Sequence, residues 1–168
     1  EVFSVKTVML LEARMLDPDV EPAEKAVIGW LLSLTYASLR GDDLIHVAPD
    51  FLELLDAALV GVAWQTKVGR KMKGTKFAII RASMSKNDWV PVWYSIIKSP
   101  LKEGETRDYL FECPADDFKG FRSGVPCGMD VVRKPAPKIL KNAGAPEAEA
   151  QSGCVHRRRR TPINAGAH

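Results

Sequence analysis

Apolar positions recur at helical spacing in residues 22–40, PAEKAVIGWLLSLTYASLR. Side chains three or four residues apart lie on one face of a helix, so this run predicts an amphipathic helix. Pro22 and Glu24 suit its first turn. We expect the helix to end at Arg40 and Gly41 to stop it, because arginine is favourable in a last turn and glycine is common after one. Its apolar face consists of Val27, Trp30, Leu31, Leu34 and Ala37.

Two runs rich in β-branched and aromatic residues follow, at 59–68 (LVGVAWQTKV) and 74–83 (GTKFAIIRAS). They flank the glycine-bounded basic stretch GRKMKG at 69–74, so we expect a β-hairpin with a basic turn. The preceding segment, APDFLELLDAAL, predicts a proline-initiated turn followed by a short helical or extended piece.

A second helix is predicted within residues 87–101, NDWVPVWYSIIKSPL. Asp88 is a candidate N-cap, and Pro91 falls in the first turn, where proline is tolerated. One helical stripe then holds Trp89, Val92, Trp93, Ile96 and Ile97, which we expect to be core. Residues 106–114, TRDYLFECP, predict a short strand or extended segment.

From residue 114 onward glycine and proline become frequent and the apolar periodicity fades. Residues 134–153, KPAPKILKNAGAPEAEAQSG, have the composition of a linker. We therefore expect a lead-in segment at 1–21, one ordered domain at 22–133, and a poorly ordered Ala/Pro-rich linker and basic tail at 134–168. The predicted fold class is α+β and mainly α, a helical domain with a small antiparallel sheet.

The 168 residues suffice for one domain with an ordinary core, since 46% are apolar. No run of 18 or more apolar residues could span a membrane, and the N-terminus does not have the pattern of a signal peptide. A chain that begins at Glu1 without Met is expected to be a fragment of a longer protein. Cys113, Cys127 and Cys154 are too few and irregular for a disulfide framework, and a zinc site with His156 lacks a CxxC pair.

The net charge of +3 is local in origin. Arg157–Arg160 account for it, and without them the chain has 20 basic and 21 acidic residues. A nucleic-acid surface must therefore be a local cluster. The predicted hairpin is one, because Lys67, Arg70, Lys71, Lys73 and Lys76 occur there without an acidic residue.

Two of the cations suggest chemistry. Lys67 follows VAWQT directly, so we expect it at a strand end, where a fixed ammonium can donate a proton to a leaving oxygen. The guanidinium of Arg40 could bind two phosphate oxygens and stabilise charge that develops in a transition state. Asp43, three residues on, could hold that guanidinium or brace its loop. The alternatives are a solvated helix end and a solubilising loop.

The stretch LSLTYASLRGDDL followed by GVAWQTKVGRKMKGTKFAII resembles the start of the catalytic domain of tyrosine recombinases, the phage-integrase family. In that family a Leu-Arg pair ends a helix, an acidic residue follows three positions later, and a hairpin bears a catalytic lysine. Arg40, Asp43 and Lys67 occupy those places. The phrases SLRGDDL, WQTK and RDYLF are most similar to recombinases of eukaryotic mobile elements, and the resemblance covers residues 22 to about 112.

The resemblance implies recombination and integration of double-stranded DNA through a 3′-phosphotyrosyl intermediate, without a metal or other cofactor. Arg40 would contact the scissile phosphate, Lys67 would be the general acid, and Arg70, Lys71, Lys73 and Lys76 would bind DNA. His156 and Arg159 match the spacing of the family's His-x-x-Arg motif, although four consecutive arginines satisfy it easily. The intact protein would be intracellular, nuclear if eukaryotic, and homo-oligomeric on DNA.

The family's nucleophilic tyrosine should follow the His-x-x-Arg motif, yet Tyr36, Tyr94 and Tyr109 all precede His156. We therefore expect this chain to be inactive in strand cleavage. Two alternatives stay open: a non-catalytic DNA-binding module with a decayed recombinase fold, and a small helical protein-interaction domain.

Overall fold

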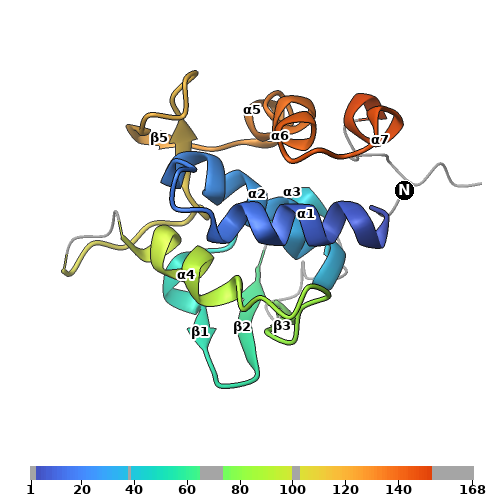
Figure 1. The fold of residues 1–168 in the computed structure, drawn as a ribbon. Coiled ribbons are helices and arrows are strands. Elements are labelled where there is room, and N and C mark those ends of the chain that lie inside the picture. The colour runs from blue at the N-terminus through green and yellow to red at the C-terminus, as the bar shows by residue number, and fades with distance from the viewer. Residues whose placement is uncertain (1–2, 38, 65–73, 100–102, 153–168) are drawn as a thin grey trace, which may run out of the picture.

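The computed structural model describes residues 3–37, 39–64, 74–99 and 103–152. It confirms an α+β fold that is mainly helical, with one three-stranded and one two-stranded antiparallel sheet (Figure 1). Its elements are α1 (Val5–Leu16), α2 (Pro22–Tyr36), α3 (Gly41–Ile45), a 3₁₀ turn (Pro49–Phe51), β1 (Glu53–Leu54), β2 (Ala58–Ala63), β3 (Thr75–Ile80), α4 (Val90–Lys98), β4 (Glu112–Pro114), β5 (Phe121–Pro126), α5 (Met129–Val132), α6 (Ala136–Asn142) and α7 (Glu147–Ser152). The β1–β3 sheet lies on one side of α1 and α2, and α5, α6 and α7 lie on the opposite side.

Helix α2 forms the centre of the core. Its residues from Ala23 to Ser33 are all buried, as expected for a helix that other elements cover on every face. Helix α4 packs closely on it at Gly29, where an added Cβ would lie 1.9 Å from Trp93 Cδ1. The Trp93 Nε1–H also donates to the Ala26 carbonyl at 3.0 Å. Trp93 therefore fixes α4 on α2 by both shape and a hydrogen bond.

The predicted end of this helix was wrong. Helix α2 ends at Tyr36, and Arg40 is the extended N-cap of the next helix, α3, which begins at Gly41. Two carboxylates, Asp42 and Asp43, fall in the first turn of α3, where the helix dipole favours negative charge. Gly41 starts a helix rather than stopping one, because it passes over Trp30: a Cβ there would lie 2.6 Å from Trp30 Cζ2.

The predicted hairpin is confirmed. Strands β2 and β3 pair antiparallel from Ala58↔Ile80 to Ala63↔Thr75, and β1 adds a short third strand on the other edge of β2. The inward side chains of this sheet are buried in the core and include Leu59, Ala63, Phe77 and Ile79. The predicted segment before the hairpin forms the 3₁₀ turn and β1.

The predicted helix at 87–101 is also confirmed, as α4, with Pro91 in its first turn. Asp88 is not its cap, however. The Asp88 carboxylate accepts hydrogen bonds from the guanidinium of Arg81, with Arg81 Nε 3.1 Å from Oδ2, so it is engaged with the end of the β3 segment. Trp89 takes the N-cap position without a side-chain hydrogen bond.

The expectation of a linker from residue 134 needs correction for residues 136–152. These form α6 and α7, and the side chains of Ala136, Ile139 and Leu140 are fully buried. The lead-in at 1–21 is likewise a core helix, α1, with Val8, Leu11 and Met15 fully buried. One hydrophobic core extends from Phe3 to Ala150, so the predicted boundaries at 21/22 and 133/134 do not separate packed units.

No helix in the described ranges has the length and hydrophobicity needed to cross a bilayer.

Candidate functional site

Arg40 lies at the surface, directly before α3. Its carbonyl accepts the Leu44 N–H at 3.1 Å and so begins the helix. No side chain among the described residues holds its guanidinium by a hydrogen bond or ion pair. The backbone of Arg40 is therefore fixed by α3, while its planar group stays available to a ligand with two acceptor oxygens.

Helix α3 is anchored on both sides, and this anchoring positions Arg40. It contacts α2, where the Trp30 Nε1–H donates to the Gly41 carbonyl at 3.4 Å, and it contacts α5. Its own residues Leu44 and Ile45 are buried. Asp43 is half-buried in its first turn, which places this carboxylate at the helix start; its predicted support of Arg40 stays a prediction.

Much of the predicted site lies outside the described residues. This applies to Lys67, Arg70, Lys71 and Lys73 in the segment between β2 and β3, and to His156 and Arg159. Lys76 is described: it lies on β3, exposed, opposite Val62 of β2. The structure therefore supplies the helix start that carries Arg40 and the two strands that carry the basic segment.

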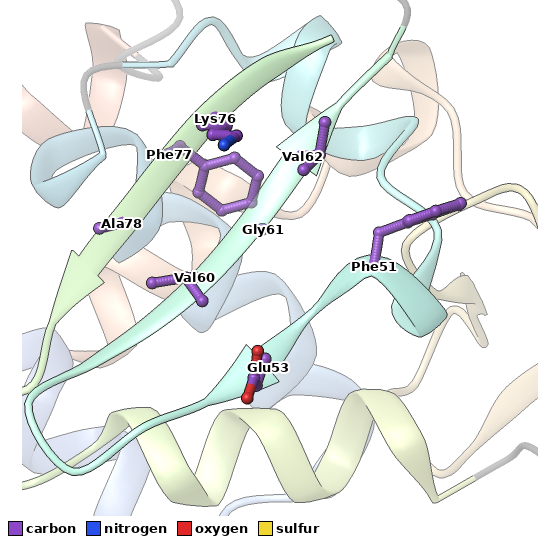
Figure 2. A pocket seen from close by; sticks show the side chains of 8 residues that line it. All are labelled: Phe51, Glu53, Val60, Gly61, Val62, Lys76, Phe77 and Ala78. Carbon is purple, nitrogen blue, oxygen red and sulfur yellow. The ribbon is translucent and has the colours of Figure 1, made fainter. Parts of the chain in front are cut away.

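An open apolar groove of about 560 Å³ lies along the β1–β3 sheet (Figure 2). Phe51 and Trp64, each about half exposed, meet edge to face beside it with ring centroids 5.7 Å apart. Its lining is Phe51, Glu53, Val60, Gly61, Val62, Lys76, Phe77 and Ala78. With one carboxylate and one ammonium, the groove suits apolar contact better than acid–base chemistry. Sequence reasoning missed it, although apolar residues on both faces of β2 signal it.

A polar network forms around the buried carboxylate of Glu12 on α1. The Tyr36 hydroxyl donates to the Glu12 carboxylate, which is fully buried, and this carboxylate also accepts the Ser85 N–H at 2.8 Å. The Met84 N–H donates to Tyr36 Oη at 3.0 Å. These bonds tie the loop after β3 to α1 and α2. The sequence analysis did not find this network, because its members are far apart along the chain.

This network makes Tyr36 a poor nucleophile. Desolvation by burial, and then the hydrogen bond to Glu12, raise the pKa of Tyr36 to about 12. The neutral phenol therefore persists well above physiological pH. The other tyrosines lie beside cations, Tyr94 with Lys98 Nζ 5.5 Å from its ring and Tyr109 with the Arg107 guanidinium at 5.5 Å.

The described cysteines are not set up for reaction. Cys113 and Cys127 are free thiols buried in and after the β4–β5 hairpin. Burial, and then the neighbouring Cys113, raise the pKa of the Cys127 thiol to about 12, so the reactive thiolate is disfavoured. Within the described ranges, no group of three or more His, Cys, Asp and Glu side chains is arranged to hold a metal ion.

We compared the chain with known protein families, with curated protein sequences and with solved structures. None of the three comparisons finds a match.

Proposed function

We propose that this chain binds double-stranded DNA as part of a tyrosine-recombinase type catalytic domain. The observation that carries the proposal is the position of Arg40: an exposed, uncommitted guanidinium at the start of α3, with acidic residues in the following turn. The antiparallel hairpin that comes next in the chain adds support, because the segment joining its strands contains four cations and no acidic residue.

Each residue has a defined role in this proposal. Arg40 binds non-bridging oxygens of the scissile phosphate and stabilises the charge that develops on them. Lys67 donates a proton to the leaving 5′-oxygen. Arg70, Lys71, Lys73 and Lys76 bind neighbouring phosphates and release counterions. His156 and Arg159 would complete the phosphate-binding set.

The 168-residue chain is proposed to bind DNA without cutting it. The recombinase reaction needs a tyrosine after the His-x-x-Arg motif, and none follows His156 in this sequence. Tyr36 cannot substitute readily, since its hydroxyl is bonded to Glu12 and its pKa is raised to about 12. Covalent capture of a nicked duplex by this chain would contradict this part of the proposal.

The role of Arg40 is tested by binding of the chain to a fluorescent DNA duplex, with Arg40→Ala and Arg40→Lys beside the wild type. Charge-assisted hydrogen bonds contribute about 1.5–3 kcal/mol, so Arg40→Ala should weaken binding at least about tenfold, given that 1.4 kcal/mol is a factor of ten. Arg40→Lys keeps the charge but loses the planar fork, so it should restore only part of the affinity.

Lys6→Ala provides the matched control, because Lys6 is an exposed cation on α1. If Lys6→Ala weakens binding as much as Arg40→Ala, the effect reflects net charge alone. The proposal of a specific phosphate site at Arg40 is then wrong. If Arg40→Ala leaves the affinity for the duplex unchanged, Arg40 is a solvated residue at a helix start and does not contact DNA.

A protein-interaction domain is the second candidate, and the outer face of the β1–β3 sheet favours it. Antiparallel sheets commonly present polar side chains to solvent, whereas here Ile80 of β3, together with Phe51 and Trp64 beside the sheet, is about half exposed. This function predicts no duplex binding by the wild type, together with self-association or partner binding that Trp64→Ser abolishes.

A further inference from the structure

We infer that a second cationic surface, made by α5 and α6, binds the phosphate backbone of the same DNA duplex. This surface consists of Arg133, Lys134, Lys138 and Lys141. The inference rests on the proposed DNA binding and adds three residues from the predicted linker, Lys134, Lys138 and Lys141, together with Arg133 at the end of the predicted domain.

Helix α6 holds two of these cations, Lys138 and Lys141, outward because its other face is in the core. Ala136, Ile139 and Leu140 are fully buried, whereas Lys138 and Lys141 are exposed. Lys138 and Lys141 are three residues apart, so they are neighbours on one helix face, about 5 Å apart along the axis. Their positions are thus set by core packing and do not depend on a free chain segment.

The surface adjoins the element that carries Arg40. Helix α5 contacts α3, and a Cβ added at Gly41 would lie 3.1 Å from Met129 Cε. Arg133 follows Met129 by one helical turn, with its N–H donating to the Met129 carbonyl at 3.3 Å. Residues one turn apart lie on the same face of a helix. Arg133 is therefore on the side of α5 that contacts Gly41, and the chain leads from it to α6.

The charge of this surface is positive. Within residues 128–146 there are four cations and a single carboxylate, Asp130. Acidic residues also lie in the β4–β5 turn, which the surface approaches, since Lys138 Nζ is 5.9 Å from the Phe118 ring. There Asp116 pairs with Arg122 at 2.8 Å, and Asp117 accepts the Lys119 N–H at 2.9 Å.

The carboxylates of α7, which packs on α6, are also engaged. Glu147 accepts a hydrogen bond from the side-chain amide of Gln151 at 2.9 Å, and Glu149 is hydrogen-bonded to Ser4 and Thr7 at the start of α1. The four cations therefore face solvent without a dedicated anionic partner among the described residues.

The chemistry of the surface selects duplex phosphate over unpaired bases. Single strands are bound by combining cations with exposed aromatic rings on which bases stack. Here the aromatic side chain in contact with the surface, Phe118, is buried and lies under Lys138. Cations held at helical intervals without a stacking ring are suited to a regular array of phosphates.

The test compares two variants of the 168-residue chain that lose the same charge. Lys134→Gln/Lys141→Gln removes two exposed cations of the surface, and Lys6→Gln/Lys86→Gln removes two exposed cations elsewhere. Binding to a fluorescent duplex is measured across a salt series. Each lost phosphate contact lowers the slope of log affinity against log salt by about 0.9, so we expect the surface variant to lose about two units and the control to lose none.

Each outcome decides the inference. Salt-sensitive wild-type binding with a lower slope only in the surface variant supports it. An equal change in both variants, or no change in either while the wild type binds, overturns the second surface and leaves the proposed function standing. Absence of duplex binding by the wild type overturns both. Unchanged circular dichroism shows that the variants are folded.

Discussion

At the level of single residues, Glu12 holds distant segments of the fold together. It is a fully buried carboxylate that accepts hydrogen bonds from the Tyr36 hydroxyl and the Ser85 N–H. A buried charge is tolerated only when such partners satisfy it. Glu12 therefore joins α1, α2 and the loop after β3 in one polar contact.

We predict that Glu12→Ala destabilises the protein by about 2–4 kcal/mol, because it leaves buried donors without an acceptor. Urea denaturation measures the free energy of unfolding. Glu103→Ala, at an exposed carboxylate, is the control and should change it by less than about 0.5 kcal/mol. Equal stability of the two variants would mean that the Glu12 network does not form in solution.

At the level of secondary-structure elements, two helices of the chain, α1 and α6, are not predicted by the pattern of apolar residues. Helix α1 carries Val8, Leu11 and Met15 at helical spacing, but Glu12, which is also buried, interrupts its apolar pattern. Helix α6 has only seven residues, with prolines at its start, so its apolar pair Ile139 and Leu140 carries little periodicity. Contacts with α2 and α7 stabilise α6, and these contacts are invisible in the local sequence.

The packing of α6 gives a direct prediction. Leu140→Ala should cost about 2–5 kcal/mol of unfolding free energy, since it opens a cavity in the core. Lys141→Ala, at the exposed neighbour, should cost less than about 0.5 kcal/mol. Thermal denaturation followed by circular dichroism measures both. A Leu140→Ala variant as stable as the wild type would show that residues 136–152 do not belong to the folded core.

At the scale of the whole molecule, the sequence predicted the elements whose signals are local. The glycine-bounded GRKMKG marked the β2–β3 hairpin, and the stripe containing Trp93 marked α4. The end of α2 could not be read locally, because Arg40 and Gly41 fit a helix end as well as a helix start. Packing of Gly41 over Trp30 decides between the two.

The candidate functional residues also fall into two groups, those that the local sequence indicates and those that it does not. Arg40 and the basic hairpin segment were evident from charge and order along the chain. The Glu12–Tyr36 network joins residues 24 positions apart, and the α5–α6 surface depends on which face of a short helix is buried. Both require the tertiary structure, so residue patterns alone did not reveal them.

We propose that this chain binds duplex DNA electrostatically through the hairpin and Arg40. The most direct measurement is the salt dependence of duplex binding by the wild type and by Arg70→Gln/Lys71→Gln/Lys73→Gln. We predict salt-sensitive binding by the wild type and a slope lower by about 2.7 in the variant, at about 0.9 per phosphate contact. Wild-type binding that is absent, or that keeps the same slope in the variant, would contradict the account.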